Sequence, residues 1–388
     1  MHSGRTVFAQ LMDYVSKHEF RKCVRRYNGN YRVRRFSCSD QFLCMAFGQL
    51  TYRESLRDTI TCLRAMQPKL YHVGIRGRIS RATLADANEK RDWRIYEDLA
   101  AVLITMARKL YSDERFGVEL SQPAYVFDST TIDLCLSLFP WAPLRKKKAA
   151  IKLHTLMDLK GSIPCSVWVS DGKTSDRVML DALITEPGSF YILDRGYVDF
   201  ARLYTVAKSS AFFIVRAMKN LDYGRRESRT VEKTSGLRSD QTIILKGPKS
   251  SRLYPNPLRR VSFFDSERHV RYVFLTNNFD LDALTITQLY KCRWQVELFF
   301  KWIKQNLRIK AFYGTSENAV KTQTWIAISI YVLVAIIKKH LNIKHSLSEI
   351  LQILSLSLIE NDPLPQLLSE FNLKAVDNES RNQLNLFN

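Results

Sequence analysis

Two short apolar runs that each stop at an aspartate constrain the fold of this chain more than any other feature. Ala124–Phe127 is followed by Asp128, and Phe190–Leu193 is followed by Asp194. Such runs are typical of strands buried on both faces of a sheet, and ligands gather at the carboxyl ends of parallel strands. A single aspartate in this position is usually only a turn or a helix cap, so the two must be weighed together with other evidence.

The region from 121 to 216 alternates strand patterns with helix patterns. Helices are expected over Ser175–Leu183 and Asp199–Lys208. Strands that come first in a hairpin-like series and then alternate with helices predict a mixed sheet flanked by helices. The expected strands are Ala124–Phe127, Ile151–Asp158, Ile163–Val169, Phe190–Leu193 and Phe212–Val215.

A third carboxylate, Glu297, lies in a long helix pattern. The stretch Leu289–Lys310 contains no Gly or Pro and follows a Thr285-x-x-Gln288 pattern, which predicts one continuous helix with a capping box. At about 100° per residue, four polar side chains fall within an arc of roughly 60°, beside an apolar face. They are Tyr290, Arg293, Glu297 and Lys304. Taken alone, the pattern also fits a solvated face in which Glu297 pairs with Arg293 and Lys301.

The spacing Y-x2-R-x3-E-x6-K resembles the signature of DDE transposases of the insertion-sequence-four family, to which the transposon-five transposase also belongs. Asp128 and Asp194 match the two aspartates of that family. The resemblance implies a ribonuclease H-like fold whose first and fourth strands hold the aspartates side by side. The expected fold class is therefore mixed α/β (α+β): a ribonuclease H-like core with a β-rich insertion and a helical N-terminal domain.

The segment 217–271 is polar, basic and rich in turns. A loop of that length is improbable within a compact domain, so the segment should have structure of its own. Possible strands are Thr242–Lys246, Arg260–Phe264 and Arg271–Leu275. The segment resembles the β-rich insertion of the same family, and it places 103 residues between Asp194 and Glu297 (297 − 194) against 66 between the aspartates (194 − 128). Retroviral integrases have a short second spacing.

The first 120 residues form a mostly helical pattern and resemble the leading domain found in one branch of these transposases. The first eighty residues hold 15 Lys and Arg against 5 Asp and Glu. The run Arg21–Arg35 interleaves cations with Tyr27 and Tyr31, which suits phosphate contacts with some stacking and also suits a solvated surface. Glu54–Met66 and Ser80–Lys90 could form a helix-turn-helix, although the linker is long for one. Further helices are expected over Phe8–Val15, Asp40–Leu50 and Trp93–Tyr111.

Composition agrees with a nucleic-acid enzyme. The 388 residues carry a formal net charge of +21 with a pI near 9.7, so polyanions are the expected partners. Seven scattered cysteines without C-x-x-C spacing favour reduced thiols in a cytosol and argue against a zinc site. The resemblance to the transposase family implies a bacterial cytoplasmic protein associated with the nucleoid. The apolar stretch Trp325–Ile337 is too short to cross a bilayer, so a buried helix and no membrane partner are expected.

These patterns together predict four parts. They are a helical N-terminal domain over 1–120 that binds DNA, a catalytic domain over 121–216 plus 272–345, a β-rich insertion over 217–271, and a helical segment with a polar tail over 346–388. Recognition of terminal repeats is the hypothesis for the first part.

The resemblance also implies the chemistry. Asp128, Asp194 and Glu297 would be catalytic and would hold two Mg²⁺ ions, with Mn²⁺ as a substitute and Asp128 bridging them. The enzyme would cleave transposon ends, pass through a hairpin and join 3′-hydroxyls to target DNA, acting as a dimer on double-stranded inverted repeats. The expected DNA contacts are Tyr290, Arg293, Lys304 and Arg195. Tyr254, Phe263 and Phe264 are candidates to stack a displaced base, with a core role as the alternative.

Two other functions remain open at this stage. A ribonuclease H-like nuclease without strand transfer would need the three carboxylates but not the Tyr-Arg-Lys face. A non-enzymatic DNA-binding protein descended from a transposase would be expected to have lost a carboxylate, whereas all three are present.

Overall fold

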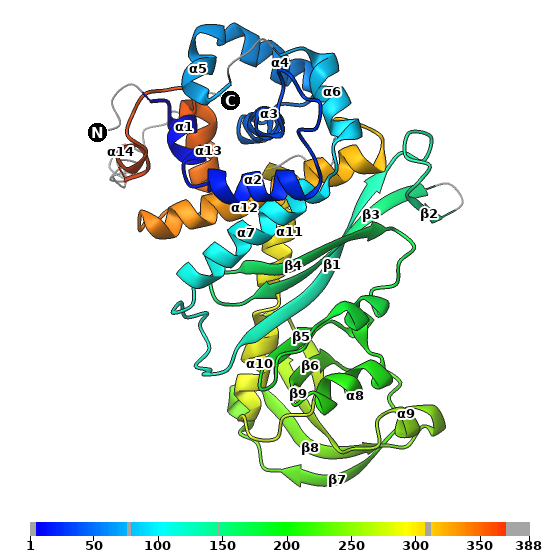
Figure 1. Cartoon of the computed structure of the whole chain (residues 1–388). Coiled ribbons are helices and arrows are strands. Elements are labelled where there is room, and N and C mark those ends of the chain that lie inside the picture. Colours follow the sequence, from blue (N-terminus) through cyan, green and yellow to red (C-terminus); the bar gives the residue numbers. More distant parts are fainter. Residues whose placement is uncertain (1–4, 76–78, 146–147, 307–311, 370–388) are drawn as a thin grey trace, which may run out of the picture.

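The computed structural model describes residues 5–75, 79–145, 148–306 and 312–369. In Figure 1 the N-terminal and C-terminal helices gather at one end of the molecule. One large sheet runs from beneath these helices to the other end, where the insertion strands lie. The polar tail expected from Lys374 lies outside the described residues.

The core of the sheet has the expected strand order. β1 is antiparallel to β3, β3 is antiparallel to β4, and β1, β5 and β6 run parallel, which gives the order β4-β3-β1-β5-β6. This is the order expected of a ribonuclease H-like core, with the first and fourth core strands adjacent. A short strand, β2, pairs with the other end of β3. The bounds are β1 Ala124–Leu134, β2 Pro143–Arg145, β3 Lys148–Asp158, β4 Ile163–Asp171, β5 Phe190–Leu193 and β6 Phe212–Arg216.

Two expectations for this region are wrong. The first strand does not end before Asp128 but runs on to Leu134, because β3 pairs with it along its whole length. In place of a helix over Ser175–Leu183 there is only a 3₁₀ turn, η2 (Val178–Ala182). The helix α8 (Phe200–Lys208) is confirmed, with Asp199 as its N-cap accepting from the backbone N–H groups of its first turn.

The insertion extends the central sheet instead of forming a separate one. β10 is antiparallel to β6, and β9, β8 and β7 follow it in order. The three expected strands are confirmed, while β7 and a short helix, α9, were not predicted. The bounds are β7 Tyr223–Arg229, β8 Leu237–Leu245, α9 Pro248–Leu253, β9 Leu258–Asp265 and β10 Val270–Thr276.

Five of the described N-terminal helices, α1–α4 and α6, begin at Ser or Thr caps. The side chains of Thr6, Ser16, Ser37, Ser55 and Ser80 each accept from the backbone of the helix that follows. Helix α2 was not predicted. The helices suggested as a helix-turn-helix, α4 and α6, are separated by a 3₁₀ turn and α5, so no tight turn joins them. The bounds are α1 Val7–Met12, α2 Lys17–Arg26, α3 Cys38–Leu50, α4 Leu56–Ala65, η1 Gln67–Lys69, α5 Leu70–Val73, α6 Arg81–Lys90 and α7 Arg94–Leu110.

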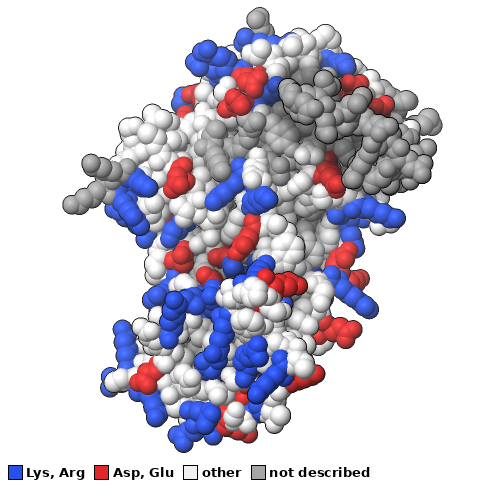
Figure 2. Space-filling model, turned by 180° about the vertical axis from the view of Figure 1, so that it is seen from behind, with Lys and Arg blue, Asp and Glu red and all other residues white. Residues whose placement is uncertain are grey.

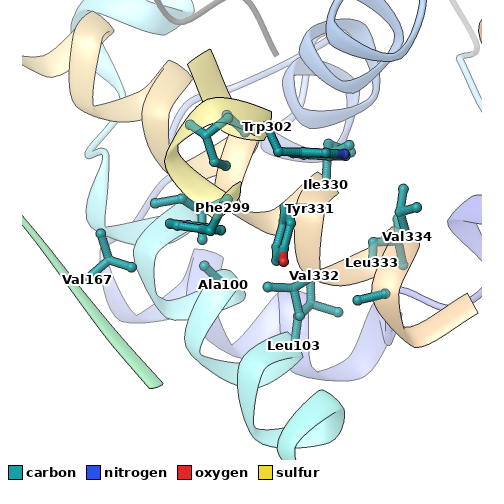
Figure 3. Packing of buried hydrophobic residues seen from close by; sticks show 14 of the residues in the cluster. Ala100, Leu103, Val167, Phe299, Trp302, Ile330, Tyr331, Val332, Leu333 and Val334 are labelled. Atoms are coloured by element: carbon teal, nitrogen blue, oxygen red, sulfur yellow. The ribbon is translucent and has the colours of Figure 1, made fainter. Parts of the chain in front are cut away.

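The longest helix, α12 (Glu317–His340), forms the centre of the core. By length and composition it could cross a membrane, but nearly all of its apolar window is buried inside the protein, as the sequence predicted. Figure 3 shows Tyr331 of α12 between α7 and two aromatic residues of α11 (Trp294–Asn306), the helix that contains Glu297. Its ring lies 4.8 Å from that of Phe299 and 4.7 Å from that of Trp302, measured between ring centroids. Helices α13 (Leu347–Ser357) and α14 (Leu364–Ser369) follow.

The N-terminal helices share this core with α12 and do not form a detached body. One continuous cluster of buried apolar residues includes side chains of α1, α3, α7, α11 and α12. Hydrogen bonds reinforce the contact: the Tyr111 hydroxyl donates to the Ala335 carbonyl at 2.9 Å, and the Gln49 amide donates to the Gln323 carbonyl at 3.1 Å.

Truncation within α12 tests this arrangement. Leu333 is fully buried, so Leu333→Ala leaves a cavity and should lower the free energy of unfolding by about 2–5 kcal/mol. The matched control is Leu356→Ala on α13, where the side chain is 85% exposed and the change should stay within about 0.5 kcal/mol. Urea denaturation followed by circular dichroism measures both. Equal effects of the two substitutions would contradict the central position of α12.

Candidate active site

The two predicted aspartates lie on adjacent parallel strands. The parallel pairing of β1 with β5 ends at the pair Phe127 and Leu193, so Asp128 and Asp194 occupy the next position on each strand. Neighbouring strands are about 4.8 Å apart, which brings the two residues together. Asp128 is therefore at the end of the parallel pairing, although it is in the middle of its own strand.

The predicted glutamate helix consists of two helices. α10 spans Ala283–Lys291 and α11 spans Trp294–Asn306, with a turn at Cys292 and Arg293 between them. In this turn the N–H groups of Arg293, Gln295 and Val296 bond to carbonyls three residues earlier, which replaces the spacing of four in an α-helix. The expectation of one continuous helix is thus wrong, and its predicted part beyond residue 306 lies outside the described residues.

The predicted N-terminal cap of this segment is also wrong. α10 begins at Ala283, and its N-cap is Asp282, three residues before Thr285; the Asp282 carboxylate accepts from the Thr285 N–H at 2.9 Å. The Thr285 hydroxyl donates to the same carboxylate. The two side chains therefore hold the first turn of α10, which leads to Tyr290 at its last turn.

Arg293 connects two of the three carboxylates. Its Nη1 donates to Asp128 Oδ2 at 2.5 Å, and its Nη2 donates to Glu297 Oε1 at 2.5 Å. Within the same group, the Tyr290 hydroxyl donates to Asp194 Oδ1 at 3.0 Å. The residues of the predicted signature and the two upstream aspartates thus form one hydrogen-bonded cluster, drawn from β1, the end of β5, and the α10–α11 segment.

The electrostatics of the cluster are those of crowded carboxylates. Burial, with smaller contributions from Asp194 and Glu297, raises the pKa of Asp128 to about 6, against the opposing effects of Arg293 and the Ser129 N–H. The pKa of Tyr290 is also raised, by burial and by the charge on Asp194. Burial opposes the charge on Arg293, but Asp128, Tyr290 and Glu297 together raise the pKa of Arg293 above its usual range. The three carboxylates therefore act on one another as neighbouring charges.

The other two predicted DNA-contacting residues pair with backbone. Lys304 donates to the carbonyl of Thr131 at 2.7 Å and so ties α11 to β1 three residues beyond Asp128. Arg195 donates through Nε to the carbonyl of Ala217 at 3.1 Å, just after β6. Both are close in sequence or in space to the cluster, and both hold its supporting elements in place.

A pocket beside Glu297 was not predicted as a site. It has a volume of about 160 Å³ and combines aromatic rings with cations. The Lys291 ammonium lies over the Phe263 ring and the Arg216 guanidinium over the Tyr272 ring, at 5.0 Å each from the ring centroid. Trp294, which is 52% exposed, lies at the rim. Phe263 was named from the sequence as a candidate to stack a base, whereas Trp294 was missed although it stands within the Y-R-E-K signature.

The three aromatic candidates for base stacking differ in the structure. Tyr254 is fully buried against Tyr204 and Phe213, so it belongs to the core. Phe263 is largely buried but lines the pocket beside Glu297. Phe264 is covered by the guanidinium of Arg238 at 5.2 Å from its ring centroid.

Carboxylates and a histidine near the cluster have structural partners. Asp158 accepts from the Lys160 N–H in the turn between β3 and β4. Asp176 accepts from the Ser129 hydroxyl at 2.8 Å and pairs with Lys152 at 3.2 Å. His154 is fully buried beside Ser170, and burial lowers its pKa to about 4, so it is neutral at physiological pH.

The donor set of the cluster fits hard divalent cations. Its three acidic side chains offer only carboxylate oxygens, which Mg²⁺ prefers. Within the described ranges, no three His, Cys, Asp or Glu side chains converge as ligands of a single ion, and Arg293 lies between Asp128 and Glu297. The acidic side chains present therefore suit a hard divalent cation.

Comparison with known proteins agrees with this class of site. Residues 119–333 match the family described as Transposase DDE domain, and residues 3–76 match a domain of unknown function, DUF4372. The fold and the carboxylate cluster define a phosphoryl-transfer enzyme of the DDE type. The chain belongs to the DDE transposases of the insertion-sequence-four type and is an enzyme of DNA cleavage and strand transfer.

Two sequence relatives support this membership. The y4zB protein of Sinorhizobium fredii (strain NBRC 101917 / NGR234), described as a transposase, is 31% identical over 258 residues, which are 65% of this chain and 70% of the relative. The protein described as the transposase of insertion sequence element IS5377 of Geobacillus stearothermophilus is 32% identical over 241 residues, which are 61% of this chain and 63% of the relative. A piggyBac transposase synaptic complex with hairpin DNA aligns with a TM-score of 0.47 and 10% identity over 90% of this chain and 79% of that one.

The pKa of Asp128 yields a test of the cluster in metal-free protein. Its folded-state pKa of about 6 exceeds the usual value of 3.8, so the folded state loses stability as the pH rises through this window and Asp128 ionises. Asn cannot ionise. The stability of Asp128→Asn relative to the unchanged protein should therefore rise by on the order of 2–3 kcal/mol between pH 4 and pH 7. Urea denaturation measures the free energy of unfolding of both proteins at each pH. If the two free energies change with pH in the same way, Asp128 titrates as an ordinary surface carboxyl and the prediction is contradicted.

Proposed function

We propose that Asp128, Asp194 and Glu297 are the catalytic carboxylates of this transposase. The observation that carries this assignment is the Arg293 guanidinium, which binds Asp128 and Glu297 at once while Tyr290 binds Asp194. Asp128 and Glu297, 169 positions apart (297 − 128), meet at one guanidinium, and Arg293 and Glu297 both belong to the Y-R-E-K signature.

The carboxylates would hold two Mg²⁺ ions, for which Mn²⁺ can substitute. Asp128 would contact both ions, with Asp194 and Glu297 on one each. When bound, the ions would supply an activated attacking oxygen, a stabilised leaving oxygen and a neutralised phosphoryl group. Two carboxylates per ion agrees with the lack of a three-ligand cluster among the described residues.

The substrate of this site is double-stranded DNA at the terminal inverted repeats of the element. The enzyme nicks the transposon end, the freed 3′-hydroxyl attacks the opposite strand to form a hairpin, and the reopened end is joined to target DNA. Tyr290, Arg293, Lys304 and Arg195 contact phosphates near the cleaved end, which positions the strand without reading its sequence. Two protomers act together, because two transposon ends must be joined.

The insertion supplies further positive surface next to the site. Figure 2 shows Lys and Arg side chains gathered over the half of the molecule that contains the insertion strands. Exposed cations of these strands and their turns are Arg225, Arg226, Arg238, Arg268 and Arg271. A polyanion that enters the cluster from this side is attracted before any specific contact forms. The insertion over 217–271 would thus be a DNA-guiding part of the catalytic domain.

The aromatic pocket beside Glu297 accepts a base displaced when the hairpin forms. Trp294 at its rim offers an exposed ring. Phe263 and Tyr272 line the pocket, and their rings are covered by Lys291 and Arg216, respectively. Stacking of a base on an aromatic ring contributes about 1–3 kcal/mol. Extrusion of a base costs a similar amount, so the pocket would offset most of that cost.

Substitution of the carboxylates tests the catalytic assignment. Asp128→Asn, Asp194→Asn and Glu297→Gln should each reduce Mg²⁺-dependent cleavage of end DNA by about a thousandfold or more, because each removes an ion ligand. Asp133→Asn is the matched control, since Asp133 is an exposed carboxylate on the same strand as Asp128. Gel analysis of labelled end DNA measures the rates. Cleavage that survives in Asp128→Asn or Glu297→Gln would refute the site.

The pocket has a separate test. Trp294→Ala should leave the first nick unchanged and reduce hairpin formation about tenfold, since the stacking energy is lost only when the base is displaced. The control is Leu298→Ala, an exposed apolar residue one turn further along α11. Denaturing gels separate nicked from hairpin products. Equal loss of both products, or loss in the control, would remove Trp294 from this role.

Strand transfer distinguishes the transposase from a nuclease with the same carboxylates. A pre-cleaved end with a 3′-hydroxyl should be joined to plasmid DNA in Mg²⁺, and the joined product should be missing with a 3′-dideoxy end. Cleavage without any joined product would favour a nuclease function.

A further inference from the structure

A basic groove lies in the N-terminal domain, outside the site described above. It has a volume of about 690 Å³ and is lined by α2, by the segment that follows it, and by the start of α3. Lys17, Arg21 and Arg25 lie along one side of α2 at spacings of four residues, so they form a row about 12 Å long. Tyr31 and Ser39 are on the opposite side. We call this feature the α2 groove.

The groove has a strong excess of unpaired positive charge. Residues 17–39 contain eight Lys and Arg but a single acidic residue, Glu19. Lys22 pairs with Glu19, and Arg26 pairs with Asp98 of α7. The other six cations make no ion pair with an acidic side chain of the described ranges, and all are exposed; they are Lys17, Arg21, Arg25, Arg32, Arg34 and Arg35. Like charges held this close repel one another, and a bound polyanion relieves the repulsion.

The shape of the groove is fixed before any ligand binds. The ion pair of Arg26 with Asp98 holds α2 on α7, and the Asn30 side chain accepts from the Cys38 N–H at 2.8 Å. Gly29 packs so closely that a Cβ there would lie 2.4 Å from Ile95 Cδ1. Arg32 adopts a left-handed backbone with φ of 55°, and its guanidinium lies over the ring of Tyr31, which is 70% exposed. An ordered cationic surface loses little conformational entropy on binding.

We infer that the α2 groove binds the phosphate backbone of double-stranded DNA, at the transposon end that the catalytic cluster cuts. This inference rests on the proposed function for the identity of the DNA. A row of Arg and Lys on one helix side, with Tyr and Ser hydroxyls opposite, offers the donors that phosphate oxygens accept. Tyr31 is the one large apolar side chain that the groove exposes among the described residues, which disfavours a lipid surface.

The test is the salt dependence of DNA binding by the full chain. Arg21→Gln/Arg25→Gln is compared with Lys22→Gln/Arg57→Gln, which removes two exposed charges of the same domain outside the groove. Fluorescence anisotropy with labelled end duplex, in EDTA to prevent cleavage, gives Kd at several salt concentrations. The groove variant should bind at least about tenfold more weakly, and its slope of log K against log salt should fall by about 1.8. The control should match the unchanged protein.

Each result decides the inference. The inference is overturned if the groove variant and the control have equal affinity and equal salt slope. It is also overturned if the groove variant binds duplex DNA as the unchanged protein does but loses binding to polyglutamate or to anionic vesicles. Circular dichroism and thermal unfolding of both variants establish that the fold is intact. The measurement involves neither metal nor cleavage, so it remains valid even if the proposed catalytic function is wrong. If the unchanged protein cleaves end DNA but the groove variant binds DNA normally, only the inference about the α2 groove is refuted.

Discussion

The Arg293 guanidinium is the group on which the arrangement of the active site depends. It lies between a carboxylate of β1 and a carboxylate of α11, and it faces both with separate nitrogens. Charge-assisted bonds of this kind are stronger than neutral ones, and two from one planar group also fix direction. Without this cation, the largely buried Asp128 and the exposed Glu297 would repel each other. β1 and α11 are distant in sequence, and Arg293 joins them at the proposed catalytic site.

The rest of the fold serves to hold α11 in register with β1. The apolar side of α11 packs through Phe299 and Trp302 against Tyr331 of α12, so Glu297 is directed away from the core. Lys304 adds a second attachment, from the last turn of α11 to the Thr131 carbonyl of β1. β1 must extend past Asp128 for this attachment to exist, and its long pairing with β3 supplies the extension. The buried α12 and the pairing of β3 with β1 therefore support the geometry of the proposed catalytic cluster.

Much of the fold and the cluster could be predicted from the sequence, because short-range patterns determine them. The bounds of β5 follow from four apolar residues between polar ones, and those of α6 follow from the Ser80 cap and the residues after it. The turn at Cys292 and Arg293 could not be predicted, since the segment contains no residue that breaks a helix. There the contacts of Arg293 with carboxylates on two elements accompany the break, and such tertiary contacts leave no local signal. The length of β1 was missed for the same reason: the polar residues after Asp128 are poor indicators of a strand until β3 pairs with them.

The charge balance of the cluster explains why a single arginine is insufficient there. Asp128, Asp194 and Glu297 contribute three negative charges when ionised, while Arg293 contributes one positive charge. Burial, together with the neighbouring Asp194 and Glu297, keeps the pKa of Asp128 raised to about 6 despite its contact with Arg293, so the folded protein still disfavours ionisation of Asp128. DNA brings further negative charge, so its approach would raise the free-energy cost of ionising Asp128 further. Only additional cations can make full ionisation compatible with bound DNA. Divalent ions with oxygen ligands meet that need at the same place where a phosphodiester must be neutralised for attack.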